Sequence, residues 1–409
     1  MVSSIINNQS SIINNQSPLK PFKPNRNPKT IPTMKKTLII ALAFLGMQSA
    51  SAKDWTVTEV KTIITKVNDT WQQNHPKQER SFWDPAVYHT GNMEAAKYMN
   101  NRKWYQYSYD WAEQNLWQGA RETDNTKWKY KTYGEGHQFV LFGDWQICFQ
   151  TYIDLYNSPL APADKEFMVK RAKEVMGFEA YSDASDYWWW AEALYMVMPV
   201  MTKMYKLTGD KQYLTKMHDN WLYANSIMYD KKTGLYFRDG KYVFPKHTTA
   251  AGKKDFWARG DGWVVAAFAK ILQDLPKDDA NRKEYIKYYK KIVKGVAACQ
   301  QAEGYWTRSM MDAEQAPGRE TSGTALFAYG IQWGINNGIL SKKYQKVVDK
   351  AWEYLATIAL QPDGTVGYVQ PIGEKAIPGQ VVNQKSVTNF GTGAFLLAAC
   401  EYARHLEKK

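Results

Sequence analysis

The sequence is poor in the residues that build disulfide frameworks and metal centres. Its 409 residues include only three cysteines, Cys148, Cys299 and Cys400, each within an apolar run, and six histidines. No His, Cys or Asp group has metal-ligand spacing. There is also no G-x-S-x-G nucleophile motif and no glycine-rich phosphate loop. We therefore expect neither a metal nor a cofactor, and we expect the cysteines to be small buried hydrophobic residues.

Long apolar runs are equally scarce. The only one lies in "MKKTLIIALAFLGMQSASA", residues 34–52. Two lysines precede it and small residues end it, which is typical of a cleaved signal peptide. It is too short for a membrane span. We expect a secreted or periplasmic protein with no membrane contact after cleavage, preceded by an unstructured extension, residues 1–33.

The charge is positive but carries no nucleic-acid motif. The formal net charge is +13, and residues 1–52 contribute six of the positive charges and no negative one. Lysines are scattered along the remaining chain, as in "KYYKKIVKG", which is typical of a solvated helix face. We expect no nucleic-acid partner. A polyanionic sugar fits the same charge.

Helical periodicity dominates from residue 55 onward, whereas strand signals are weak and short. Apolar residues recur at spacings of three and four in segments such as "GWVVAAFAKILQDL" and "TGAFLLAACEYARHL". No Gly-rich or Ser-rich linker divides the chain. The sequence therefore predicts one all-α domain over residues 53–409.

Glycine turns followed by aromatic residues recur after successive helices, at 230–240, 301–309 and 361–371. Each lies between two predicted helices, about 60 to 70 residues from the next, so each marks one helical hairpin. This repeat favours a toroid of hairpins with a pocket at one mouth. An open helical solenoid is the alternative, although its repeats are usually shorter.

Aromatic residues are abundant, with 17 Trp and 27 Tyr, and the densest group surrounds Glu192 in "YWWWAEALYMV". Helical spacing would place Trp188, Trp189, Glu192 and Tyr195 on one side of a helix. A carboxyl among rings is partly desolvated, which raises its pKa and suits a proton donor. The alternatives are an exposed Glu192 or one paired with an arginine.

A second group lies in "DFWARGDGWVVAAF". The planar fork of Arg259 can hold a sugar carboxylate through two hydrogen bonds, and Trp257 and Trp263 can form pocket walls. Asp261 is explained equally well as a helix cap.

Two weaker candidates stand near other helix starts. Asp144 precedes an apolar helix and is either a cap or a second active-site carboxylate. Tyr88, His89 and Thr90 form a polar trio that interrupts an apolar run, which suggests substrate binding.

Together, "DYWWWAEALYMVMPVMTKMYKLTGDKQYL", "TGLYFRDG", "FWARGDGWVVAAFAKIL", "RETSGTALFAYGIQWGINNG", "DGTVGYVQP" and "NFGTGAFLLAACEY" resemble the unsaturated uronyl hydrolases of glycoside hydrolase families 88 and 105. The resemblance is closest to the unsaturated rhamnogalacturonyl hydrolases of family 105. It implies an (α/α)6 barrel and an enzyme that removes a 4,5-unsaturated uronic acid from the non-reducing end of lyase-generated oligosaccharides. It also implies that a carboxylic acid protonates C4 and that water adds at C5.

The resemblance also implies roles for particular residues. Glu192 stands where the family's acid/base is typically Asp, and Asp144 resembles the second carboxylate. The extra methylene of Glu192 requires an adjusted pocket, and we expect Glu192 to be the general acid/base, with Asp144 or Asp186 as the alternative acid. Arg238 stands where some members have His. The implied substrate-binding residues are Trp189, Arg238, Trp257, Arg259 and Trp263, with Arg259 as the carboxylate clamp.

Two other functions fit a sugar pocket on this fold. A sugar epimerase needs a pair of histidines at its pocket, and the six histidines show no such pair. A non-catalytic sugar-binding relative would retain the pocket without turnover, and the Glu at the acid position motivates it. Oligomeric state, the galacturonate or glucuronate identity of the sugar, and the neighbouring sugar are left open.

Overall fold

A computed structural model describes residues 53–131, 138–160 and 164–409. The predicted extension, residues 1–33, and the predicted signal peptide, residues 34–52, lie outside these described residues. Within them the chain is helical, with isolated β-bridges in place of a sheet. This agrees with the all-α prediction.

Helices in the described chain fall into two classes by burial. The outer class presents one apolar face and includes α1 (Val57–Asn74), α3 (Arg102–Gln114), α6 (Lys165–Ala180), α8 (Gln212–Met228), α10 (Arg282–Ala297) and α12 (Gln345–Tyr354). The inner class is buried along most of its length and includes α2 (Trp83–Met99), α4 (Gly143–Gln146) with α5 (Cys148–Tyr156), α7 (Ala191–Thr208), α9 (Ala258–Asp274), α11 (Thr321–Asn336) and α13 (Asn389–Leu406). A helix that is buried all round must lie inside a larger core.

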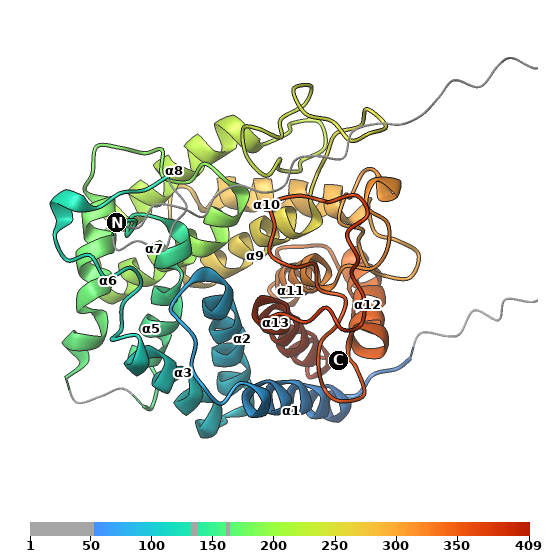
Figure 1. Ribbon diagram of the computed structural model, residues 1–409, viewed down its shortest axis with the longest axis horizontal. Coiled ribbons are helices and arrows are strands. Elements are labelled where there is room, and N and C mark those ends of the chain that lie inside the picture. The colour runs from blue at the N-terminus through green and yellow to red at the C-terminus, as the bar shows by residue number, and fades with distance from the viewer. Residues whose placement is uncertain (1–52, 132–137, 161–163) are drawn as a thin grey trace, which may run out of the picture. The chain divides into compact units, whose positions relative to one another are not determined.

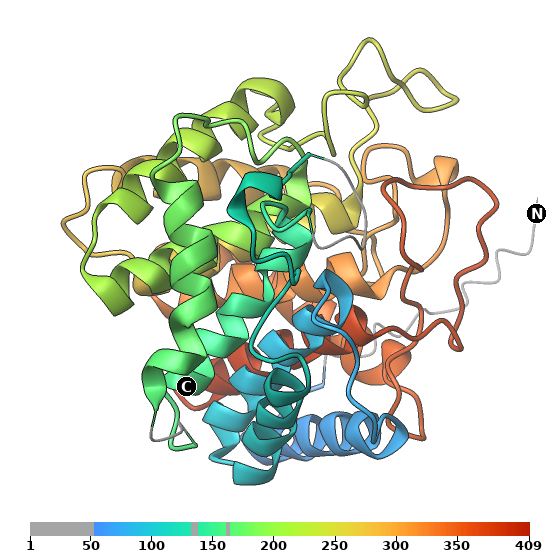
Figure 2. The same ribbon diagram turned by 60° about the vertical axis from the view of Figure 1, so that its left-hand side comes forward.

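The inner helices close a ring. Around the ring α2 packs on α13, α13 on α11, α11 on α9, α9 on α7, α7 on α5, and α5 on α2. Figure 1 looks into this ring, and Figure 2 shows the same helices from the side. Outer and inner helices alternate along the chain, so the described residues form six hairpins. The predicted (α/α)6 barrel is therefore confirmed.

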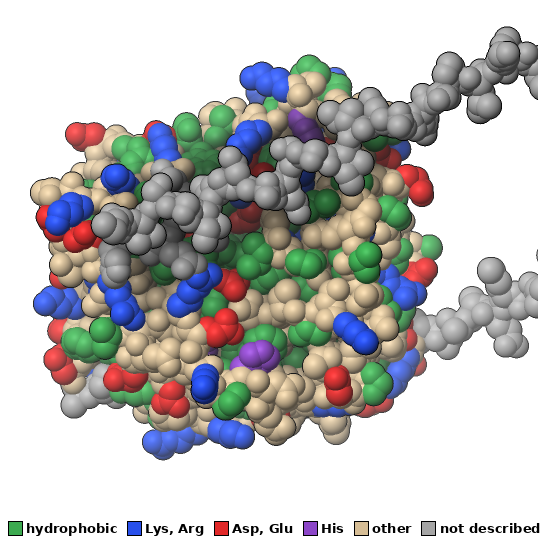
Figure 3. Space-filling view, in the orientation of Figure 1, with side chains coloured by type: hydrophobic (Ala, Val, Ile, Leu, Met, Phe, Trp, Pro, Cys, Tyr) green, Lys and Arg blue, Asp and Glu red, His purple; other side chains and the backbone are tan. Residues whose placement is uncertain are grey.

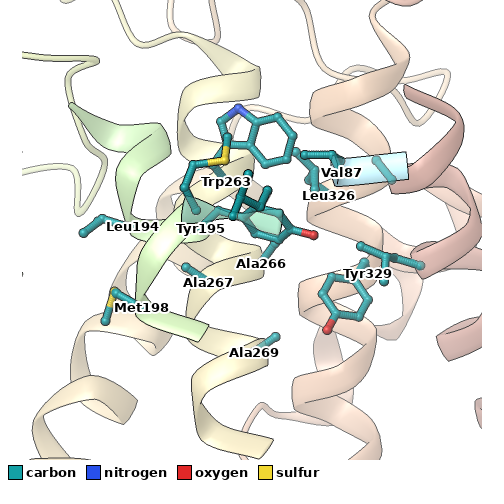
Figure 4. Close-up of a cluster of buried hydrophobic side chains, with 14 of the residues drawn as sticks. Val87, Leu194, Tyr195, Met198, Trp263, Ala266, Ala267, Ala269, Leu326 and Tyr329 are labelled. Atoms are coloured by element: carbon teal, nitrogen blue, oxygen red, sulfur yellow. The ribbon is translucent and has the colours of Figure 1, made fainter. Parts of the chain in front are cut away.

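The interior of the ring is filled rather than hollow. Figure 4 shows Val87, Tyr195, Trp263 and Leu326 pointing inward from four different inner helices, and all four are buried. Close approach also needs small residues: a Cβ on Gly91 would lie 2.2 Å from the carbonyl oxygen of Gly393. The packed interior leaves room for a ligand only at the mouths of the barrel.

The short connecting elements complete the described chain. They are 3₁₀ turns at Asn125–Lys127, Ala313–Gln315 and Lys342–Tyr344 and a π-helical turn at Leu355–Ala359. Among the described residues, no helix combines the length and apolar character needed to cross a membrane.

The predicted loop repeat is a structural repeat as well. Gly234, Gly304 and Gly364 all have positive φ, at 79°, 96° and 93°, and each closes a tight turn after an outer helix. This left-handed conformation favours glycine. Each turn leads back toward the start of the next inner helix. The repeat therefore carries loop residues to one end of the barrel.

Candidate active site

A pocket of about 400 Å³ lies at the end of the barrel where the inner helices begin. Its floor comes from the first turns of these helices, and its rim comes from the loops before them. The lining residues are Trp83, Phe142, Asp144, Trp189, Trp190, Glu192, Met196, Arg238, Lys241, Trp257, Arg259, Trp263, Ile372, Gly373 and Glu374.

One helical position recurs around the pocket. Asp144, Glu192 and Arg259 are each the second residue of an inner helix, namely α4, α7 and α9. Ser322 and Phe390, which contact Arg259, hold the same position in α11 and α13. The chemical groups of the site are thus placed by the pseudosymmetry of the fold.

The tryptophans before Glu192 lie outside its helix. The sequence predicted that Trp188, Trp189 and Glu192 share one helical face, but α7 begins at Ala191 and Trp190 is its extended N-cap. That prediction is wrong because the segment pairs with a loop instead: the Ala191 N–H donates to the Arg238 carbonyl at 2.8 Å, and Trp190 bridges Asp239. This pairing brings Arg238 to Glu192.

Glu192 is buried and paired with arginine. Nε of Arg238 lies 3.1 and 3.2 Å from the two carboxylate oxygens, and the Glu192 side chain is only 10% exposed. Burial raises the pKa of Glu192 above its ordinary value, and the positive charge of Arg238 opposes this rise. The arginine pairing considered as an alternative therefore exists, and it exists inside the pocket.

Asp144 is the second buried carboxyl of the pocket. Among the described residues, none donates a hydrogen bond to the Asp144 carboxyl. Burial raises its pKa well above the ordinary range, and the negative charge of Glu192 raises it further, while Arg238 opposes the rise. Arg238 favours the charged form of Glu192, whereas burial and the charge of Glu192 both disfavour the charged form of Asp144.

Asp186, the other alternative acid, does not line the pocket. It accepts hydrogen bonds from Lys131 and from the Tyr130 hydroxyl, the latter at 2.8 Å. Burial alone would raise its pKa, but the hydrogen bonds from Lys131 and Tyr130 lower it below the ordinary value. Its carboxyl is thus ionised and already paired.

Arg259 is buried and forms hydrogen bonds to the loop at residues 370–373, which borders the pocket. Its guanidinium donates to the carbonyls of Gln370 at 2.6 Å, Pro371 at 2.9 Å and Gly373 at 3.3 Å, and to the Ser322 hydroxyl at 3.5 Å. Burial lowers its pKa to about 10. These bonds occupy both terminal nitrogens, so the Nε–H is the donor left for a substrate among the described contacts.

The tryptophans predicted to bind substrate lie in the wall of the pocket. Trp189, Trp257 and Trp263 all line it, and Trp257 is fixed by a 2.8 Å hydrogen bond from its indole to the Gln370 side chain. The Arg238 guanidinium lies 6.0 Å from the Trp189 ring centre. The walls therefore offer flat apolar surfaces around the carboxyl groups.

The polar trio of α2 does not reach the pocket. The Tyr88 hydroxyl donates to Asn68 at 2.7 Å, Nδ1 of His89 lies 2.9 Å from the Ser108 hydroxyl, and the Thr90 hydroxyl lies 2.9 Å from that of Tyr195. All three side chains are buried. Their predicted placement at the substrate is corrected here, because none of the three lines the pocket and each lies more than one turn after the start of α2.

Several lining residues were missed by the sequence reasoning. Trp83 opens the same segment as the polar trio but stands at the first position of α2, where the pocket lies. Lys241 and Glu374 come from loops, and Glu374 bonds Arg238 at 3.2 Å and the Tyr242 hydroxyl at 2.7 Å. Position relative to the helix start would have found Trp83. Nothing local in the sequence marks Glu374.

The pocket combines two carboxyls with raised pKa values, two arginines and a cage of aromatic rings. Such a set can transfer protons and bind an acidic sugar. Among the described residues, no group of three or more His, Cys, Asp or Glu side chains is placed to hold a metal ion.

Comparison with known proteins gives the family. The model of Glycosyl Hydrolase Family 88 matches residues 55–406, nearly the whole described chain. The chain belongs to this family. The resemblance seen in the sequence is thereby confirmed.

Two similar proteins of known structure match over almost their full length. A solved structure of the polysaccharide lyase BACCELL_00875 is 61% identical to this family 88 chain, with a TM-score of 0.83 over 86% of this chain and 99% of the other. A glycosyl hydrolase family 88 protein from Bacteroides vulgatus is 56% identical, with the same TM-score and the same coverage.

A curated relative matches over a shorter region. An unsaturated 3S-rhamnoglycuronyl hydrolase from Alteromonas sp. (strain LOR) is 39% identical over 215 residues, which is 52% of this chain and 51% of the relative. The chain thus spans about half the length of the curated relatives it matches.

Proposed function

We propose that this protein is a glycoside hydrolase that removes a 4,5-unsaturated uronic acid from the non-reducing end of an oligosaccharide. The observation that carries the proposal is the buried Asp144–Glu192 carboxyl pair among tryptophans, in a chain of family 88. The hydrolase activity named for the Alteromonas relative supports it.

The pair can supply both proton steps of a hydration. One carboxyl donates its proton to C4 of the C4=C5 double bond, and water adds at C5 as its proton passes to the other carboxylate. The hemiketal formed at C5 opens to a ketone. The hemiacetal left at C1 then collapses to an aldehyde and releases the rest of the sugar as an alcohol. One water is consumed, and the carboxyl pair ends with one proton as it began.

The arginines have distinct places in this scheme. Arg238 stabilises the charged form of Glu192, so we assign the proton of the pair to Asp144 before substrate binds. The Arg259 guanidinium lies 4.6 Å from the centre of the Trp257 ring and fixes the loop that roofs the pocket. We assign the substrate carboxylate to this arginine side of the pocket.

A polysaccharide lyase is the second candidate, and one observation favours it. The polysaccharide lyase BACCELL_00875 is 61% identical over 99% of its chain. In a lyase, a carboxylate would remove the C5 proton of a saturated uronate. The bond from C4 to its glycosidic oxygen would break, a C4=C5 bond would form, and the departing oxygen would take up a proton. The ion-paired state of Glu192 suits such a base.

A single absorbance assay separates the two reactions, because the C4=C5 bond absorbs in the ultraviolet. A hydrolase lowers this absorbance when given lyase-digested rhamnogalacturonan, whereas a lyase raises it when given saturated oligosaccharides that contain a 4-O-glycosylated uronate. A fall with the first substrate and no rise with the second supports the hydrolase. The reverse pattern overturns it in favour of the lyase, and binding without either change supports the sugar-binding alternative.

We further propose export to the periplasm or the cell exterior through the segment Met34–Ala52. Amino-terminal sequencing of protein from an expressing cell tests this. A mature chain beginning at Lys53 is expected, and an intact Met34 in the purified protein contradicts it.

A further inference from the structure

A groove of about 390 Å³ lies on the outer surface, between the turn after α8 and the second half of α10. We call it the lysine groove, because four lysines line it. Its residues are Tyr229, Lys231, Lys232, Thr233, Gly234, Leu235, Lys291, Lys294, Gly295, Ala298, Cys299 and Met311.

The four ammonium groups share this groove without a counter-charge. Among the described ion pairs, none within 4.0 Å involves Lys231, Lys232, Lys291 or Lys294. The nearest acid in sequence, Asp230, is held by Lys254 at 2.8 Å. Positive charges brought together in this way repel one another, so binding of an anion in the groove is electrostatically favourable.

The nearest acid on α10 is also occupied. Glu284 lies two turns before Lys291, about 10 Å along the helix axis. It faces His218 at 3.8 Å. The cationic end of α10 therefore keeps its charge available, and the exposed ammonium groups can contact a ligand in solvent.

The floor of the groove is apolar. Tyr229 and Leu235 lie between the lysine-bearing segments, and Met311, which is 42% exposed, borders them. Gly295 allows α10 to approach the loop, because a Cβ there would lie 2.6 Å from the Thr233 carbonyl oxygen. An apolar floor with cationic edges fits sugar rings that carry carboxylate or sulfate groups better than it fits a free inorganic ion.

The groove and the candidate active site share one loop. Leu235 lines the groove and Arg238 lines the pocket, and three extended residues span at most about 10 Å. A polysaccharide chain of several sugars is longer than this distance. Two contacts on one chain strengthen each other through effective concentration.

We propose that the lysine groove is a secondary binding site for anionic polysaccharide, which holds an acidic chain next to the pocket that acts on its end. This inference rests on the proposed function for the identity of the sugar, but binding at the groove does not depend on turnover. Because the contact is electrostatic and exposed, it weakens as the ionic strength rises.

The first test measures binding of polygalacturonate, with neutral dextran as the control ligand. The groove variant Lys231→Gln/Lys232→Gln/Lys291→Gln/Lys294→Gln is compared with a matched variant that loses four exposed lysines elsewhere, Lys103→Gln/Lys170→Gln/Lys346→Gln/Lys385→Gln. We expect the groove variant to bind polygalacturonate about tenfold or more weakly at low salt, and the matched variant to bind like the original protein. Equal losses in both variants overturn the proposal, as does equal binding of dextran.

Cys299 supplies an independent readout. It is half-buried in the groove, whereas Cys148 and Cys400 are buried. We expect polygalacturonate to slow the alkylation of Cys299 in the original protein and not in the groove variant. Protection by anionic lipid vesicles, without protection by polygalacturonate, overturns the proposal in favour of a membrane surface.

A kinetic comparison separates this inference from the proposed function. Turnover of a disaccharide, which is too short to reach the groove, is expected to be unchanged in the groove variant. Turnover of a long acidic chain is expected to show a raised KM. The protein could show no activity on any uronate while polygalacturonate binding still depends on the four lysines. That result would overturn the proposed function but support the lysine groove as a binding site.

Discussion

The two mouths of the barrel differ in how their charged side chains are paired. At the mouth where the inner helices begin, Asp144 has no hydrogen-bond donor among the described residues, and Glu192 pairs with Arg238. At the other mouth, a larger cavity of about 700 Å³ is lined by lysines and acids that pair with each other. Lys203 pairs with Asp154 and lies 3.8 Å from Asp274.

Helix direction explains part of this difference. The amino-terminal ends of the inner helices carry partial positive charge and meet at the pocket, which favours an anionic substrate. The carboxyl-terminal ends meet at the other mouth, where Lys97 and Lys206 stand in last turns. Cavity size is therefore a poor guide in this molecule. The candidate active site lies at the smaller cavity.

The strongest test of the comparison removes the carboxyls of the pocket. Glu192→Gln and Asp144→Asn keep the size of each side chain but cannot transfer a proton, so we expect activity to fall by about 10²- to 10⁴-fold. The ultraviolet assay measures this. Asp186→Asn is the matched control, because Asp186 lies off the pocket, and its activity is expected to stay within about twofold of the original. Full activity in Glu192→Gln would show that Glu192 takes no part in proton transfer.

The other mouth predicts an effect on stability instead. Lys203→Met leaves Asp154 and Asp274 without their shared ammonium, and we expect the free energy of unfolding to fall by about 2 kcal/mol. Urea unfolding measures it, and turnover at low temperature should be unchanged. Lys206→Met is the control, since this lysine is 56% exposed and its pair with Asp274 is worth less than about 1 kcal/mol. A loss of turnover in Lys203→Met would mean that the second mouth takes part in the reaction.

A smaller effect on activity is expected from substitution of Arg259, which links the pocket to the loop at residues 370–373. Arg259→Lys keeps the positive charge but loses most of the three bonds that hold residues 370–373. We expect KM to rise by about tenfold with a smaller change in kcat, since the roof of the pocket loosens while the carboxyls stay in place.

Arg308→Lys provides the control for Arg259. Arg308 also holds this loop, through the Gln380 carbonyl at 2.8 Å, but it does not line the pocket. An equal rise of KM in both variants would assign the effect to the loop alone, whereas a rise confined to Arg259→Lys supports its place beside the substrate.

The sequence predicted the barrel well for a physical reason. Inner and outer helices differ in how much of their surface is apolar, and the positive-φ glycines of the three loops repeat with the hairpins, so both signals are local. Asp144, Glu192 and Arg259 were found because the site uses the beginnings of inner helices, which helix-start signals mark.

The rest of the site depends on contacts between distant segments. Glu374 reaches Arg238 across 136 residues, and no local pattern predicts such an approach. Tyr88 was misplaced for a different reason. A polar residue within an apolar helix can bind either a ligand or another buried polar group, and here the partner is Asn68, a buried residue of the outer helix α1. Chemistry alone does not separate these two uses.

The smallest predicted effect concerns a buried carboxyl that lies at neither mouth. Glu179 accepts bonds from Gln146 at 2.7 Å and from Trp188 and Asn220 at 3.2 Å, and burial raises its pKa to about 7, although the bonds from Gln146 and Trp188 oppose the rise. In the unfolded chain this carboxyl ionises near pH 4.5. Its contribution to stability is therefore fully present below that pH and is lost as the pH rises toward 7, at no more than about 1.4 kcal/mol per pH unit.

Glu179→Gln should flatten the stability profile between these pH values, as measured by urea unfolding at a series of pH values, whereas Glu166→Gln, at an exposed pair, should not. Activity in Glu179→Gln is expected to remain, because this carboxyl already has three donors and faces no pocket. A raised pKa marks burial, whereas a carboxyl of the candidate site must also line the pocket, as Asp144 and Glu192 do. A loss of activity in Glu179→Gln without loss of folding would contradict that distinction.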